Sequence, residues 1–295
     1  MGYQGRKRLN YMPLGLLSRY GLALLIGMGW TEVVADSSVN VPLDHWVYRY
    51  LERLEAQGKV NDNVGGIKPY SRNEIANLIK VANEESSSDL TRIERAELDL
   101  LRGEFAFELK EAGLSADNSW ADGLRSGRPM AVYRADEGAI FADLLVRQQT
   151  DRFIGRDRAA AEMVYRNRVG GIIRGHLGDK IGFRLGFEQI REQGSRNYTF
   201  RHDVYERRLE LPQLKGNLAD FHQGTAYLSF AVGPVDVQVG KDEVSWGPAP
   251  EQNLGLGNNG PSFNMIRLKS RLGAFKLVSI SAELRPCPDR PDSPL

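Results

Sequence analysis

The spacing of apolar residues divides the chain into a helical part and a longer β part. Between residues 36 and 114, apolar side chains recur every three or four positions, which is the spacing of helices with one buried face. From about Ala131 they recur at every second position, as in antiparallel strands with one apolar and one polar face. The pattern therefore predicts a mainly β chain, with an antiparallel β region over residues 131–284 preceded by a small helical bundle.

Three helices are predicted in the first part. Their expected ends are Asp44 and Gly58 for the first helix, a capping box of Ser71 and Glu74 for the second, and Thr91 with Glu94 for the third. The third helix is expected to continue through Phe105 to Leu109. Each helix has one apolar face, so the helices should pack on one another or on the region that follows. Residues 115–130 are polar, with glycine and proline, and are expected to form a linker.

The clearest strand pattern lies in residues 180–190. Apolar residues alternate there with glycine, arginine and glutamate; they are Ile181, Phe183, Leu185 and Phe187. The same alternation begins again at Ile140, Ala226, Val235 and Ile266. Turns are expected at Gly178-Asp179 and Gly233-Pro234. The region has room for about eight strands, at roughly 18 residues for a strand and its turn.

Two architectures produce this alternation. They are a soluble sandwich, whose apolar faces form a core, and an outer-membrane barrel, whose apolar face meets lipid. Strands of about ten residues, glycine inside strands and signs of export favour the barrel. The polar face is rich in charge, above all in Arg166, Arg168, Arg174 and Arg184. In a barrel these arginines would line the lumen, where they can contact a solute or pair with Asp and Glu.

Residues 1–35 have the layout of a secretory signal peptide. Basic residues precede an apolar run from Gly21 to Trp30, and Val33-Val34-Ala35 offers a cleavage site before Asp36. The apolar run is shorter than the roughly 20 residues that a membrane-spanning helix needs. We therefore expect the chain to be exported and, as a barrel, to lie in the outer membrane in contact with its lipid.

Composition narrows the function further. The 39 Lys and Arg residues balance 38 Asp and Glu, whereas a general nucleic-acid binder carries a large basic excess, so no nucleic acid is expected as a partner. The single cysteine, Cys287, excludes an intramolecular disulfide, and the four scattered histidines form no metal motif. Neither a GxSxG nor a Walker motif is present, and the GxGxxG match at 255–260 lacks the preceding strand and following helix. No enzyme activity, cofactor or metal is expected.

Two stretches carry a resemblance to a known family. The first runs from Lys241 through Trp246-Gly247-Pro248 and Asn258-Asn259 to Arg267, and the second comprises residues 41–54 and 69–75. Over about residues 39–284 the chain resembles the capsule assembly Wzi family. The resemblance implies an outer-membrane β-barrel with a helical part on its periplasmic side. It also implies a lectin that binds nascent capsular polysaccharide and holds it at the cell surface, with the capsule export machinery as a further candidate partner.

The candidate polysaccharide contacts combine aromatic, amide and charged groups, which bind sugars through ring faces and through hydrogen bonds to hydroxyls. They are Trp246, Asp242, Lys241, Asn258, Asn259, Arg267, Arg166, Arg168, Arg174 and Arg184. A structural alternative stays open for each kind: the tryptophan at a corner of the wall, the asparagines in a turn, and the arginines in ion pairs.

In one respect the chain differs from the Wzi family. Family barrels are considerably larger than about eight strands. Residues 285–295 contain four prolines and no strand pattern. We expect a family member that lacks its C-terminal strands.

A second interpretation also fits the helical part. Asp44-His45-Trp46 and Tyr70-Ser71-Arg72-Asn73-Glu74 look like part of an S-layer homology module. The chain would then be a porin-like outer-membrane barrel with a cell-wall-binding module, and peptidoglycan would be its partner. An exported polysaccharide-modifying enzyme is a third class, and the sequence leaves these alternatives open.

Overall fold

The structure is a computed structural model of the chain. It describes residues 38–60, 66–86, 89–113, 129–154, 161–178, 180–195, 213–247, 253, 256–257, 261–272 and 275–283. The predicted signal peptide, most of the predicted linker and the proline-rich residues 285–295 lie outside the described residues. Every described element belongs to one compact unit, Ala35–Leu295.

The N-terminal part is helical, as the 3.6-residue period predicts. Its helices are α2 (Val47–Ala56), α3 (Arg72–Ser86), α4 (Arg92–Glu104) and α5 (Ala106–Glu111). A two-stranded sheet joins β1 (Ile67–Lys68) to β9 (Ser245–Trp246). Within the described ranges, none of the helices has both the length and the apolarity needed to cross a membrane.

Local hydrogen bonds set the starts of two helices and the end of another. At the start of α3 the Glu74 N–H donates to Ser71 Oγ (3.1 Å) and the Ser71 N–H to Glu74 Oε2 (2.9 Å). The same reciprocal pair joins Thr91 and Glu94 before α4. Gly58 follows α2 with a φ of +71°, a left-handed conformation that suits glycine. Both predicted capping boxes and the predicted stop are confirmed.

Two details of the helix prediction are wrong. The N-cap of the first helix is Trp46 and not Asp44, whose carboxylate accepts a hydrogen bond from Arg147 Nη1 at 3.0 Å. The side chain that meets the start of α2 is His45, whose Nδ1 accepts from the Val47 N–H at 3.2 Å. The predicted third helix is interrupted at Phe105, where α4 ends and α5 begins. Phe105 is fully buried there, and the Arg72 guanidinium lies 4.2 Å from its ring centre.

The helices form their own apolar core. Its fully buried side chains include Tyr50, Leu51, Leu54, Ile75, Ile79, Leu101 and Phe105. They come from α2, α3, α4 and the residue that joins α4 to α5, at the spacing of three or four that predicts these helices. The helical part is therefore stabilised by its own hydrophobic packing, independently of the sheet.

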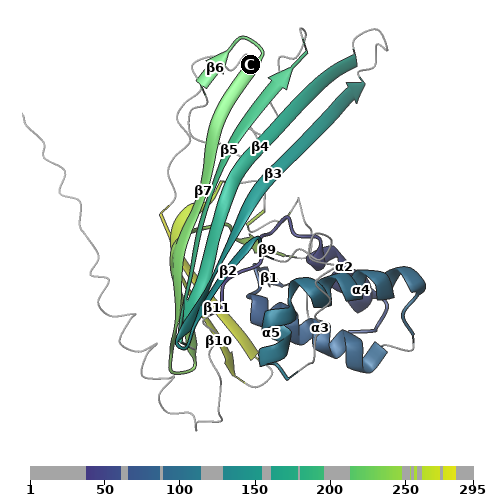
Figure 1. Ribbon diagram of the computed structural model, residues 1–295, viewed down its shortest axis with the longest axis vertical. Helices are drawn as coiled ribbons and strands as arrows, with labels where there is room; N and C mark the ends of the chain where they lie inside the picture. The colour runs from purple at the N-terminus through teal and green to yellow at the C-terminus, as the bar shows by residue number, and fades with distance from the viewer. Residues whose placement is uncertain are drawn as a thin grey trace, which may run out of the picture. The chain divides into compact units, whose positions relative to one another are not determined.

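The β region forms one antiparallel sheet. Its strands are β2 (Ala131–Ala135), β3 (Gly138–Ile154), β4 (Ala161–Leu177), β5 (Ile181–Gly194), β6 (Gln213–Lys215), β7 (Leu218–Val232), β8 (Val235–Asp242), β10 (Phe263–Leu272) and β11 (Phe275–Ala282). Their order is β11-β10-β8-β7-β5-β4-β3-β2, with β6 beside β7, and Figure 1 shows the long strands β3, β4, β5 and β7 side by side. Nine strands are thus present where about eight are predicted. In the described residues the sheet is not closed into a barrel, because no pairing joins β2 to β11.

The turns between strands follow the prediction. Gly178 separates β4 from β5 and Gly233 separates β7 from β8, both with a φ of +56°. That conformation costs glycine little and other residues more, so these positions suit tight connections. From each turn the two strands pair in a constant register, as far as Val164 and Gly194 for β4 and β5 and as far as Ala226 and Lys241 for β7 and β8.

The two faces of the sheet have the opposite burial from a soluble protein. On β5 the apolar Ile181, Leu185 and Phe187 are 41–55% exposed. The alternate positions point to the other face, where Arg184 and Glu192 are 9% and 0% exposed. We call the first side the apolar face and the second the polar face. The helical part contacts the polar face at Arg174, Arg267 and Lys269, whereas the apolar face is left open.

Glycine within the strands allows close packing on the apolar face. Gly175 of β4 lies directly opposite Phe183 of β5. A Cβ atom at Gly175 would lie 2.7 Å from Cζ of Phe183 and 2.4 Å from the carbonyl oxygen of Ala139, which is too close for any side chain. The phenylalanine ring therefore covers backbone that the glycine leaves bare.

The capping box of α4 can be tested by substitution. Thr91→Ala removes the hydroxyl that accepts from the Glu94 N–H, so we expect the helical part to lose about 1 kcal/mol of stability. Thr91→Ser keeps the hydroxyl, so this variant should retain most of the stability of the helical part. Thermal unfolding followed by circular dichroism at the helical minimum measures both variants; an equal loss for serine and alanine would contradict the capping role.

Candidate functional site

The polar face carries the arginines that the sequence singled out. Arg166, Arg168 and Arg174 lie on β4, Arg184 on β5 and Arg267 on β10, and each is at least nine-tenths buried. Arg174 and Arg184 are direct partners across the two strands, so two like charges face each other. Such a pair is unfavourable unless other groups compensate for the charge. Three clusters of side chains connect the helical part to the positive charges of this face.

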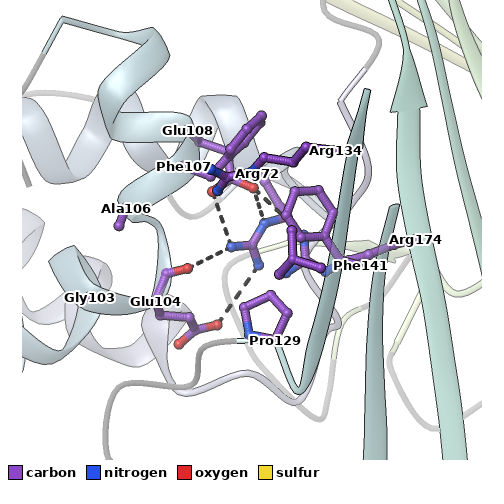
Figure 2. A pocket seen from close by; sticks show the side chains of 11 residues that line it. Arg72, Gly103, Glu104, Ala106, Phe107, Glu108, Pro129, Arg134, Phe141 and Arg174 are labelled. Atoms are coloured by element: carbon purple, nitrogen blue, oxygen red, sulfur yellow. Dashed lines mark hydrogen bonds and ion pairs between the residues drawn. The ribbon is translucent and has the colours of Figure 1, made fainter. Parts of the chain in front are cut away.

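The first cluster joins α3, α5 and β4 through two arginines and a glutamate. Arg72 binds Glu108 through two hydrogen bonds, from Nε to Oε1 and from Nη2 to Oε2 (3.2 Å), and also donates to the Glu104 carbonyl oxygen (3.0 Å). Arg174 Nη1 lies 3.7 Å from Glu108 Oε1 and Arg174 Nε lies 4.0 Å from Asp143 Oδ2. Figure 2 shows Arg72 at the centre of this group, linked to Glu104 and Glu108.

The protonation states in this cluster follow from its charges. Burial alone would raise the pKa of Glu108, but the guanidinium groups of Arg72 and Arg174 outweigh it and hold the pKa below its usual value. Burial alone would lower the pKa of Arg72, whereas Glu108 and Glu104 raise it above its usual value. The glutamate is therefore ionised, and it is bonded to one arginine and close to a second.

The second cluster is built around Asn40, which precedes the first helix. Its side-chain amide donates to Gln238 Oε1 (2.9 Å) and Asp242 Oδ2 (2.8 Å), and its Oδ1 accepts from Arg267 Nη2 (2.8 Å). Its backbone N–H donates to the Tyr227 hydroxyl at 2.7 Å. One buried asparagine therefore satisfies polar groups on three strands, β7, β8 and β10.

The third cluster is an ion pair between α3 and the strands β10 and β11. Lys269 Nζ lies 2.7 Å from Glu74 Oε2, and Lys276 Nζ lies 3.6 Å from Glu74 Oε1. Burial would raise the pKa of Glu74, but the two lysines and the Ser71 N–H lower it to about 2. Glu74 thus caps α3 and binds the sheet with the same carboxylate.

Further along the polar face, the charges pair within the sheet itself. Arg166 Nη2 lies 3.0 Å from Glu192 Oε2 and its Nη1 lies 3.3 Å from Asp151 Oδ2. Arg168 Nη1 lies 3.9 Å from Glu188 Oε2. Buried arginine and carboxylate groups thus alternate along β4 and β5.

The remaining predicted site residues fall in different places. Asp242 and Arg267 meet at Asn40, so these two candidates are brought together. Lys241 precedes Asp242 in β8 and lies on the opposite face, because successive residues of a strand alternate. Trp246 lies on β9, paired with β1, and its side chain is half exposed. Asn258 and Asn259 lie outside the described residues.

Sequence reasoning missed four residues that organise the polar face. They are Asn40, Arg72, Glu74 as an ion-pair partner, and Glu108. A signal for two of them exists in the helical pattern. Arg72 lies three residues before Ile75, and Glu108 three residues after Phe105, so both charges interrupt a buried apolar stripe. A charge in such a position needs a buried partner, and here the two are partners of each other.

These groups form a structural network of donors and acceptors. In the described ranges, no group of three or more His, Cys, Asp or Glu side chains is arranged to hold a metal ion. What the polar face offers is a dense set of guanidinium, carboxylate and amide groups on a rigid sheet. Such groups bind hydroxyl-rich or charged ligands.

Comparison with known proteins assigns the chain to no family. No family model, curated protein or solved structure matches the chain. The function is therefore argued from the geometry of the two faces.

Asn40 is the residue to change first. Asn40→Ala removes three side-chain hydrogen bonds and leaves Asp242, Arg267 and Gln238 buried with fewer partners, so we expect a loss of about 3 kcal/mol of stability. Asn167, exposed on the apolar side of β4, provides the control Asn167→Ala, which should change stability by less than about 0.5 kcal/mol. Denaturant unfolding and protection from protease measure both; equal stability of the two variants would refute the role given to Asn40.

Proposed function

We propose that this chain is an outer-membrane β-barrel protein of the capsule assembly Wzi type, which binds capsular polysaccharide and helps to hold it at the cell surface. The observation that carries the proposal is the burial of the two faces: one face exposes a continuous set of apolar side chains, while the other covers charged side chains together with a small apolar cluster that includes Ile190 and Phe221. A soluble sandwich has the reverse arrangement. Lipid is the environment in which an exposed apolar sheet face is stable.

The apolar face has a limited extent along the strands, as expected for a surface that faces the lipid of a membrane. On β3 and β4 the last apolar residues are the register partners Val146 and Val169, and at that level β5 and β7 already carry the polar Gln189 and His222. The next level is polar on all four strands, which contribute the register partners Gln148, Asn167, Arg191 and Asp220. From Val169 to Leu177 the apolar part extends about 26 Å along β4, at about 3.3 Å per residue. With a strand tilt of about 40° this covers about 20 Å of membrane, close to the apolar height of outer-membrane barrels.

Barrel closure is part of the proposal and has a physical reason. Lipid offers no hydrogen-bond partners, so a sheet with open edges is not stable within it. In an outer-membrane protein, β2 and β11 would each need a partner strand. Closure meets that need, and it turns the polar face into the wall of a lumen.

The connections between strands suggest which end faces the periplasm. Barrels of this class have short periplasmic turns and longer extracellular loops. The turns at Gly178 and Gly233 are short, whereas the opposite ends are joined by longer segments such as 195–212. The helical part binds the polar face near the short turns, through Arg174, Arg267 and Lys269. The proposal therefore places the helices on the periplasmic side and leaves the other end open to the exterior.

At the open end, exposed side chains stand beside the buried ion pairs. Arg147 is the register partner of Arg168, and Gln149 of Arg166, and both β3 side chains are exposed on the polar face. Arg147 also donates to Asp44 of the helical part, and Gln149 donates to Asp151, each at 3.0 Å. Arg166 and Arg168 pair with carboxylates, which fixes a pattern of donors and acceptors beneath them. Sugar hydroxyls both donate and accept hydrogen bonds, so this pattern suits a polysaccharide whether or not it is charged. The half-exposed Trp246 is a further candidate, because aromatic rings cover the apolar faces of sugars.

The lipid contact can be tested on a single strand. Ile173→Arg puts a charge in the middle of the apolar face, and we expect it to oppose insertion by about 2–4 kcal/mol. Asn167→Arg, on the same face of β4 but beyond the apolar part, should insert normally. The fraction of protein in isolated outer membranes measures insertion. If both variants accumulate there equally, the apolar face does not meet lipid.

The polysaccharide contact can be tested on β3. In a capsulated host, deletion of the gene should shift capsule from the cell surface to the medium. The double variant Arg147→Gln/Gln149→Ala should bind purified capsular polysaccharide about tenfold more weakly, because it removes one or two charge-assisted hydrogen bonds to the sugar. Arg152→Gln, on the opposite face of β3, is the control and should bind normally. Retention of the protein by purified peptidoglycan and not by capsule would reject the proposal in favour of a wall-binding porin.

A further inference from the structure

A cavity lies between α5 and the strands β2, β3 and β4, and the clusters described above account for only part of its lining. Its volume is about 220 Å³. Charged residues from both parts line it: Arg72, Arg134 and Arg174, against Glu104 and Glu108. The positive charges thus exceed the negative ones by one. Phe107, Phe141 and Pro129 form the apolar part of the wall.

Arg174 is incompletely satisfied where it faces this cavity. Its side chain is only 8% exposed, yet it makes no hydrogen bond to any described residue. Its nearest carboxylate oxygens are those of Glu108 and Asp143, at 3.7 Å and 4.0 Å, beyond hydrogen-bond distance. The guanidinium lies 4.6 Å from the centre of the Phe141 ring. A buried guanidinium normally makes several hydrogen bonds, so these N–H groups are available to a ligand.

Arg134 offers a second cation at the same cavity. It lies on β2, is exposed, and has no carboxylate partner among the described residues. Its guanidinium lies 5.4 Å from the centre of the Phe107 ring. Figure 2 shows Arg134 beside Phe107, and Arg174 beyond Phe141. Each guanidinium thus lies within cation–π distance of an aromatic ring, an attraction that helps to hold both groups of donors at the cavity.

We propose that this cavity binds the carboxylate of a single acidic sugar unit, a hexuronate, through Arg134 and Arg174. The cavity is smaller than the roughly 300–1,000 Å³ pockets of drug-sized ligands, and one sugar ring suits it. Guanidinium groups bind carboxylates in a bidentate manner, Glu104 can accept from a sugar hydroxyl, and Phe107 offers an apolar wall. The inference rests on the proposed function in one respect: it takes the ligand to be a unit of the polysaccharide. The site itself lies beside the helical part, away from the β3 surface tested above.

The test uses the full chain purified in detergent and three probes: glucuronate, glucose and acetate. We expect calorimetric titration to detect glucuronate binding that is at least tenfold tighter than that of acetate, with none for glucose. Arg134→Gln should weaken glucuronate binding at least tenfold, and because Arg134 is exposed this variant should fold. Arg174→Gln should do the same. Arg191→Gln, on the opposite face of the sheet, should leave binding unchanged.

Three outcomes would overturn the inference: no binding of glucuronate, acetate bound as tightly as glucuronate, or unchanged affinity in Arg134→Gln. The outcome is separable from that of the proposed function. If glucuronate fails to bind while deletion still releases capsule, the cavity site is wrong and the function stands. If glucuronate binds in the expected way while deletion leaves capsule attached, the site stands as a uronate site and the proposed function is wrong.

Discussion

Neutralising the charged face of the sheet is the constraint on which this structure depends. Five arginines on that face are at least nine-tenths buried, and a buried charge without a partner costs several kcal/mol. Carboxylates of the sheet neutralise Arg166 and Arg168, whereas the helical part supplies Glu108 to Arg174 and Asn40 to Arg267. It also supplies Glu74 to Lys269. Without the helices, Arg174 and Lys269 would keep only their longer contacts to Asp143 and Asp236 of the sheet, at 4.0 Å and 3.8 Å.

Some polar side chains of the sheet are paired with the helical part and others are paired within the sheet, so different parts of the polar face differ in chemistry. Near the short turns, groups of the helical part form hydrogen bonds and ion pairs with most of the polar side chains. Farther along β3 and β4 the buried ion pairs are internal to the sheet, and Gln149 and Arg147 beside them are exposed, with Arg147 also paired to Asp44 of the helical part. The cavity beside α5 lies at the boundary, where Arg174 belongs to the helix contact but keeps donors available. Binding capacity on the polar face thus depends on how completely the helical part satisfies each arginine.

Local and periodic features were predictable from the sequence, whereas contacts between distant segments were not. The capping boxes at Ser71 and Thr91, the turns at Gly178 and Gly233 and the alternation in β5 depend on neighbouring residues, so their signals lie within a few positions. The break at Phe105 and the partner of Asp44 depend on residues far along the chain, Arg72 and Arg147. Asn40 carries no local signal at all, because the partners of its side chain and of its N–H are on the sheet. Arg72 and Glu108 gave a partial signal, since each interrupts an apolar stripe.

The bonds of Asn40 also bear on the order in which the chain can assemble. Its partners Tyr227, Gln238, Asp242 and Arg267 lie 187, 198, 202 and 227 residues away in the sequence. During synthesis the helical part is complete long before these strands exist, and it has its own apolar core with which to fold. Contacts so distant in sequence form slowly, because a long loop must close first. The finished helices therefore act as a template: β7, β8 and β10 reach a surface on which the hydrogen-bonding positions are already fixed, so the earliest-made residues determine where the latest-made strands lie.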